Sequence, residues 1–202
     1  HTLSLDAPVP ESTAGDRAGA RTFVTARQLT REMLIESNAY RRAWAAWLPA
    51  ALPLLENEDY AAALTSFPKP ELATVPFRAA PAPAERRIAL ITTAGAYDAQ
   101  TQAPFAASSA IGDVTHRVFP TGLPDARIAL RHGHYDPAGA NADAEVLLPR
   151  RALRAAGAEL TANVISTMGY CLDWPAFIEQ TVPQLVAQAR ADGATCALLV
   201  PV

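Results

Sequence analysis

The stretch RIALITTAG, residues 87–95, indicates the fold class of this 202-residue chain. Its apolar run has the length of a buried strand, and the threonines and glycine at its end are typical of the turn that follows one. Further runs of this kind occur at residues 115–120, 126–136, 144–149, 159–170 and 194–202. We therefore expect a sheet that is built from the chain after residue 85.

Two helical patterns lie between these predicted strands, at residues 150–157 and 174–193. The second pattern has clear boundaries, because Asp173 is a suitable N-cap, Pro175 lies in the first turn and Gly193 follows the end. Strands that alternate with helices predict the α/β class, with an open and mostly parallel sheet.

Residues 1–84 are predicted to form an N-terminal extension of the α/β part, which spans residues 85–202. The first 22 residues lack periodicity, so we expect an arm there. A helix is predicted to follow, with Thr25 as its N-cap. Residues 68–83 contain five prolines and are expected to form an extended connector.

The predicted helix carries Trp44 and Trp47 at helical spacing. This aromatic face packs either against the rest of the chain or against a partner subunit. Pro49 and Pro53 are expected to end or kink the helix, because proline has no backbone N–H to donate.

The composition argues against several functional classes. A formal net charge of −3 argues against a general nucleic-acid-binding protein. No apolar run approaches the roughly 20 residues that a membrane helix needs, and no signal-peptide pattern opens the chain. Two cysteines, Cys171 and Cys196, cannot form a disulfide framework. We therefore expect a cytoplasmic protein without nucleic-acid or membrane partners.

Short polar, glycine-containing segments follow three of the predicted strands: Thr92–Gly95, His132–Asp136 and Ser166–Tyr170. In open α/β sheets, ligands bind outside the carboxyl ends of the strands. The three segments are therefore predicted to converge on one pocket that binds a small-molecule substrate.

The segment RHGHYD, residues 131–136, leaves three interpretations open. His132 and His134 have a spacing used by metal ligands, and Asp136, Asp113 or His116 would complete a divalent-metal site. Alternatively, the histidines bind or protonate an anionic or carbonyl substrate, with Asp136 setting a tautomer. In the third interpretation they form a solvated turn.

Three other features are candidates for the same pocket. The threonines and Gly95 of the TTAG turn suit the close approach of a carboxylate or phosphate. Arg117 either anchors a carboxylate or pairs with Asp113. Cys171 is a candidate reactive thiol, because a thiol near a helix N-terminus tends to have a lowered pKa, or else it is a small half-buried residue. Cys196 is expected to be in the core.

Several blocks in this order resemble one known family: RIALITTAGAY, GDVTHRVFP, RHGHYD, EVLLPRRAL, MGY and DGATCALLVPV. The resemblance covers roughly residues 85–202 and is to the B-protein family of glycine, sarcosine, betaine and D-proline reductases. It implies a flavodoxin-like fold and a thiol- or selenol-dependent reductase subunit that cleaves a small amino acid or amine. It also implies a pyruvoyl group on a partner chain, a thiol or thioredoxin-like reductant, and a homo- or hetero-oligomer.

The resemblance and the residue patterns together give one set of expected site residues. The expected catalytic residues are His132, His134, Asp136 and Cys171. The expected substrate-binding residues are Thr92, Thr93, Gly95, Arg117, Tyr135, Met168 and Gly169. No cofactor is expected within this chain itself.

One departure from the family concerns the nucleophile. The family's reactive cysteine or selenocysteine directly follows the strand that matches ALLVPV, whereas Cys196 lies inside it. The thiol is therefore expected to follow Val202, or to have been removed by cleavage, or the chain is a non-redox relative. Two alternatives remain: a metal-dependent enzyme using His132, His134 and Asp136, and a non-catalytic binding subunit that docks a partner through Trp44 and Trp47.

Overall fold

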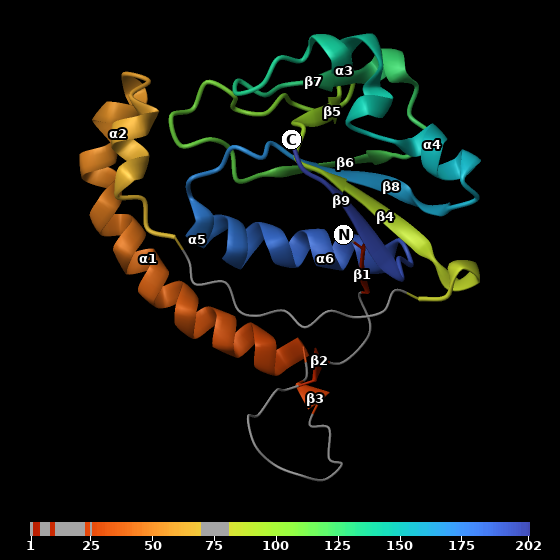
Figure 1. Ribbon diagram of the computed structural model, residues 1–202, viewed down its shortest axis with the longest axis horizontal. Coiled ribbons are helices and arrows are strands. Elements are labelled where there is room, and N and C mark those ends of the chain that lie inside the picture. Colours follow the sequence, from red (N-terminus) through yellow and green to blue (C-terminus); the bar gives the residue numbers. More distant parts are fainter. Residues whose placement is uncertain (1, 5–8, 11–22, 25, 70–80) are drawn as a thin grey trace.

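The computed structural model of the chain describes residues 2–4, 9–10, 23–24, 26–69 and 81–202. Its main sheet has five strands in the spatial order β1–β9–β4–β8–β6 (Figure 1). In that order the strands span Thr2–Ser4, Cys196–Val200, Arg87–Thr92, Glu159–Thr167 and His116–Pro120. The central strands β9, β4 and β8 are parallel, and both outer strands run antiparallel to their neighbours. The predicted α/β class is confirmed.

One face of the sheet is covered by the helical segment formed by α5 (Trp174–Ala176), a π-helical turn (Phe177–Thr181) and α6 (Val182–Ala191) (Figure 1). The Asp173 carboxylate caps this segment by accepting a bond from the Ala176 N–H over 3.1 Å. Gly193 ends it with a φ of +73°. The predicted helix and both of its boundary signals are confirmed.

The opposite face of the sheet carries a small two-stranded sheet and two short helices (Figure 1). The two strands are β5 (Ala96–Asp98) and β7 (Ile128–Leu130), and the helices are α3 (Ala138–Ala142) and α4 (Arg150–Ala155).

Successive side chains of the strands enter different layers, because they alternate between the two faces of a sheet. In β4, Ala89 packs against the α6 side, whereas Leu90 packs with Phe119 and Leu148 on the other side. Burying a large apolar side chain such as Leu90 stabilises the folded state by roughly 1.5–3 kcal/mol. The main sheet is thus sandwiched between two layers.

Two predicted strands form but are arranged differently from a parallel sheet. β6 pairs antiparallel with β8, and β7 pairs with β5 outside the main sheet. A parallel crossover needs about a dozen residues or more and usually a helix. No helix lies between β4 and β6, and only residues 121–127 separate β6 from β7. The β6–β7 connection is thus too short for a parallel crossover, and the longer β4–β6 connection lacks the helix that such a crossover usually carries.

The strand predicted at residues 144–149 is wrong. Residues Ala144–Val146 form a 3₁₀ turn instead. The Asp143 carboxylate accepts a bond from the Glu145 N–H over 3.0 Å, and the Leu148 N–H donates to the Ala144 carbonyl over 2.9 Å. A side chain that bonds to nearby backbone groups favours such a turn over a strand.

The helical extension packs on loops of the α/β part. It consists of α1 (Ala26–Glu56) and α2 (Tyr60–Thr65). The Trp44 indole N–H donates to the Leu172 carbonyl, and the Trp47 indole N–H donates to the Ala63 carbonyl over 3.1 Å. The aromatic face therefore packs within the chain, and Trp47 in particular is buried and not available to a partner.

Helix α1 does not end at its prolines. It continues past Pro49 and Pro53 to Glu56 and is curved in Figure 1. The missing N–H groups therefore do not end the helix, and curvature is a known consequence of proline inside a helix. Among the described helices, none combines the length and apolar character needed to cross a membrane.

The predicted N-terminal arm contributes a strand to the main sheet, because β1 pairs with β9. Two further segments, β2 (Val9–Pro10) and β3 (Phe23–Val24), pair with each other. The rest of the arm, the predicted N-cap Thr25 and residues 70–80 of the connector lie outside the described residues.

Candidate functional site

Three loops meet at the carboxyl edge of the central strands. The Gly95 N–H donates to the Thr167 carbonyl over 2.8 Å. The Tyr135 hydroxyl donates to the Ala94 carbonyl over 3.0 Å. These bonds join the loop after β4 to the end of β8 and to the loop after β7. The predicted convergence of the three segments is confirmed.

The glycines of these loops allow the loops to approach one another. Gly95 has a φ of +67°, and a Cβ on it would lie 2.4 Å from the Arg131 carbonyl oxygen. Gly169 has a φ of +84°, and its Cβ would lie 2.7 Å from the Thr93 carbonyl oxygen. Both positions thus require glycine because of neighbouring backbone. Gly95 and Gly169 were expected to bind substrate, and the structure shows that both serve the packing of the loops.

Two of the expected substrate-binding residues lie in the interior. Thr92 and Met168 have no exposed surface. The Thr92 hydroxyl accepts a bond from the Ala94 N–H over 3.2 Å. The Thr93 hydroxyl accepts a bond from the Val202 N–H over 2.9 Å. Thr92 and Met168 therefore support the site from behind and do not line it, which corrects the sequence-based expectation.

Arg117 holds a loop of its own chain. Its Nε–H donates to the Ala103 carbonyl over 2.9 Å, and its guanidinium lies 4.3 Å from the centre of the Phe105 ring. The Asp113 carboxylate accepts a bond from the Ala106 N–H over 2.8 Å. Both residues fix the same loop, so the structure favours a structural role for Arg117 over the anchoring of a substrate carboxylate.

The RHGHYD segment forms a turn in which the backbone engages the polar side chains. The His132 Nδ1 accepts a bond from the His134 N–H over 3.1 Å. The Asp136 carboxylate accepts a bond from the Ala138 N–H over 2.9 Å and forms no hydrogen bond with His132 or His134, so it does not set their tautomers. Burial lowers the pKa of His132, and the neighbouring His134 lowers it further. Neutral His132 is therefore favoured.

The two histidines do not complete a metal site within the described part of the chain. Their ring centres are 5.7 Å apart, with an angle of 87° between the planes. Across residues 39–69 and 81–202, no three side chains of His, Cys, Asp or Glu gather closely enough to hold a metal ion. The expected third ligands Asp136, Asp113 and His116 do not join the pair.

Cys171 differs from the expected reactive thiol. Burial raises the pKa of its thiol to about 12, and the Asp173 carboxylate contributes to the increase. A backbone hydrogen bond from Asp173 lowers the pKa but does not offset the effect of burial. The Cys171 thiol is therefore protonated at neutral pH. Cys196 is fully buried, as predicted.

A cavity of about 440 Å³ lies beside His134, and we call it the His134 cavity. Its lining consists of Leu55, Glu56, Glu58, Tyr60, Ala107, Ser108, Ser109, Ala110, Gly133 and His134. The imidazole of His134 stacks on Tyr170 with ring centres 3.9 Å apart. It also meets the Tyr60 ring edge-on at 5.7 Å. Aromatic contacts thus hold His134 at the cavity wall.

Four polar side chains of the His134 cavity have no hydrogen-bond or ion-pair partner among the described residues. The carboxylates of Glu56 and Glu58 and the hydroxyls of Ser108 and Ser109 form no hydrogen bond or ion pair with any residue that the structure describes. None of these four residues was predicted from the sequence. The run ENEDY, residues 56–60, was an available signal, because it places acidic residues beside an aromatic residue where a helix ends.

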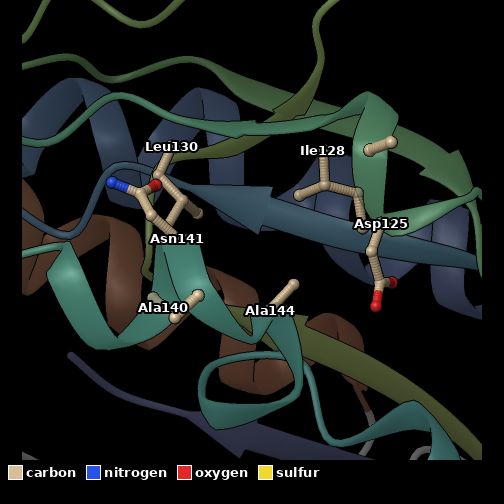
Figure 2. Close-up of a pocket in the computed structure, with 8 residues that line it drawn as sticks. Asp125, Ile128, Leu130, Ala140, Asn141 and Ala144 are labelled. Atoms are coloured by element: carbon tan, nitrogen blue, oxygen red, sulfur yellow. The ribbon is translucent and has the colours of Figure 1, made fainter.

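A second cavity, of about 180 Å³, lies between β7 and α3 (Figure 2). Ile128 and Leu130 form one side, and Ala140, Asn141 and Ala144 form the other.

Charges at this second cavity are already compensated. The Asp125 carboxylate at its rim pairs with both Arg150 and Arg151. The His134 cavity, whose two carboxylates and two hydroxyls have no partner among the described residues, is therefore the candidate functional site. No family model, no curated protein and no solved structure matches this chain, so the candidate site rests on its own geometry.

Proposed function

We propose that this chain is the substrate-binding part of a thiol- or selenol-dependent reductase that cleaves a carbon–nitrogen bond in a small amino acid or amine. The starting point is the resemblance of residues 85–202 to the reductase B-protein family. The proposal includes a flavodoxin-like relationship, a cytoplasmic location and an oligomeric assembly. The observation that carries it is a series of contacts from the end of β9 to the His134 cavity.

These contacts begin at the Val202 N–H, which donates to the Thr93 hydroxyl. The next residue, Ala94, accepts the Tyr135 hydroxyl bond through its carbonyl. The Tyr135 ring lies 4.8 Å from the His132 ring, which in turn contacts His134. A residue that followed Val202 would lie near the edge where these loops meet, and so would a thiol on that residue. This arrangement supports a shared site for the thiol and the His134 cavity.

The proposed reaction uses two thiols as its two-electron donor. One thiolate attacks the substrate carbon, so that a carbon–sulfur bond forms while the carbon–nitrogen bond breaks and nitrogen takes the electron pair and a proton. A second thiol then attacks the sulfur, which forms a disulfide, and the carbon takes a proton. Cys171 and Cys196 are buried, so the proposal takes both thiols from outside residues 1–202.

A pyruvoyl group on a partner chain would supply an electron sink for the amine nitrogen. The residues described here would hold and orient the substrate. His132 and His134 are the candidates for moving a proton at the departing nitrogen, because imidazole exchanges protons near neutral pH.

Turnover by the natural full-length protein, purified with any chains that accompany it, tests this function. When dithiothreitol or reduced thioredoxin is present, we expect release of ammonia or an amine from glycine, sarcosine or betaine, or ring opening of proline. One disulfide should form for each bond cleaved, and His134→Ala should reduce the rate. Turnover that survives complete alkylation of the thiols by iodoacetamide would contradict the proposal.

A further inference from the structure

The His134 cavity has the charge of a cation-binding site. Its lining contains two carboxylates, Glu56 and Glu58, and neither Lys nor Arg. Both carboxylates are exposed and unpaired within the described chain. An exposed ion pair is weak on its own, so a small cationic ligand would use both carboxylates together.

The cavity also offers an aromatic surface and hydrogen-bonding groups. The Tyr60 and His134 rings, which both line the cavity, have centres 5.7 Å apart and planes at 83° to each other. An aromatic face attracts a cation, in addition to the attraction of the carboxylates. The hydroxyls of Ser108 and Ser109 can donate or accept hydrogen bonds at the ligand's other polar end.

We propose that the His134 cavity binds the protonated amino group of a small amine or amino acid between Glu56, Glu58 and the Tyr60 ring. This inference rests on the proposed function only for the substrate class. The binding itself is an equilibrium that needs neither thiol nor turnover, so the two proposals can be tested separately.

Pairs of probes that differ in one charged group test the inference. Ethanolamine is compared with ethylene glycol, and glycine with glycolate, because each pair exchanges an ammonium group for a hydroxyl. The full-length protein is titrated while the backbone amide NMR signals of residues 107–110 and 133 are followed. We expect saturable shifts with ethanolamine and glycine, and about tenfold weaker binding or none with ethylene glycol and glycolate.

Carboxylate variants then locate the binding. In the double variant Glu56→Gln, Glu58→Gln, ethanolamine should bind about tenfold more weakly, which corresponds to about 1.4 kcal/mol. Glu85→Gln is the matched control, because Glu85 is an exposed glutamate outside the cavity and should leave the affinity unchanged. Equal melting temperatures of the variants would show that the fold is retained.

Several outcomes would overturn the inference. These are equal affinity for ethanolamine and ethylene glycol, absence of any saturable shift, an unchanged affinity in the double variant, and saturable Ca²⁺ binding without amine binding. If amine binding is found without reductive turnover, the reductase function fails while this inference holds. If turnover occurs with an unchanged substrate affinity in the double variant, the inference fails while the function holds.

Discussion

The His134 cavity and a cluster of ion pairs beside the second cavity both gather charged side chains, but only the cluster compensates them. We call this set the Arg150 cluster: Asp125, Asp143, Glu145, Arg150 and Arg151. Arg150 pairs with Asp125 and Glu145, and Arg151 pairs with Asp125 and Asp143. In the His134 cavity the carboxylates have no such partners among the described residues.

This difference separates structural charges from charges that are available to a ligand. Paired charges whose geometry is fixed by several bonds hold elements of the fold together. The Arg150 guanidinium, for example, also donates a hydrogen bond to the Leu123 carbonyl over 2.8 Å. Unpaired carboxylates next to a cavity add no such stabilisation. Substitutions in the two regions should therefore affect different properties, stability in the first and ligand binding in the second.

The largest effect is expected for Arg150→Met. Arg150 is only 4% exposed, and its loss leaves the Glu145 carboxylate, which it contacts over 3.3 Å, without this buried partner. Breaking a buried pair on one side costs about 3–5 kcal/mol. Urea unfolding should show this loss in the free energy of unfolding. The control Arg151→Met, at an exposed arginine, should cost much less; similar losses in both variants would contradict the distinction.

The next effect concerns the loop that supports the wall of the His134 cavity. Gly95→Ala should destabilise the protein by about 3 kcal/mol, because it combines a positive φ with a Cβ that meets the Arg131 carbonyl. Gly157→Ala is the matched control, since Gly157 has a φ of +79° and no atom within 4 Å of its added Cβ. It should cost only about 1 kcal/mol. Equal melting temperatures for the two variants would show that the close approach does not matter.

A pH titration should reveal the pairing of Asp125. A hydrogen bond from Arg151 holds the pKa of the Asp125 carboxyl below its ordinary value, and Arg150 adds to this effect. Since the folded-state pKa is lower than the unfolded value, the stabilisation is present above the unfolded pKa, near 3.9, and is lost as the pH falls through the folded pKa. Urea midpoints of the native protein and of Asp125→Asn should therefore differ at pH 7 and converge below about pH 4. A constant difference would rule out this linkage.

The smallest expected change in stability is an increase, and it concerns Glu58. Glu58 has a φ of +60°, the left-handed region where a side chain is unfavourable. Glu58→Gly should stabilise the protein by about 1 kcal/mol while weakening ethanolamine binding. Glu56→Gly, at the last position of α1, should destabilise the protein by up to about 1 kcal/mol. Thermal melting distinguishes the two, and destabilisation by Glu58→Gly would mean that its carboxylate has a structural role.

The sequence alone was sufficient for elements whose signals are local. The strands at β4, β8 and β9 follow from apolar runs, and the helix that begins after Asp173 follows from its cap and from Gly193. It was also sufficient to predict that the loops after β4 and β8 meet, because parallel strands end on the same side. The RHGHYD loop joins them although β7 lies outside the parallel sheet. The substrate-binding roles expected for Thr92 and Arg117 and the reactive thiol expected at Cys171 could not be judged from the sequence. Each depends on burial or on partners elsewhere in the chain.

Only the tertiary structure decided the direction of β6, the separate pairing of β7 and the composition of the His134 cavity. The cavity combines the turn after α1 with loops that lie about 50 and 75 positions further along the chain. Local patterns determine which residues become strand or helix, since they depend on neighbours within a few positions. Which unpaired polar groups come to share a cavity depends on long-range packing, and no local pattern records it.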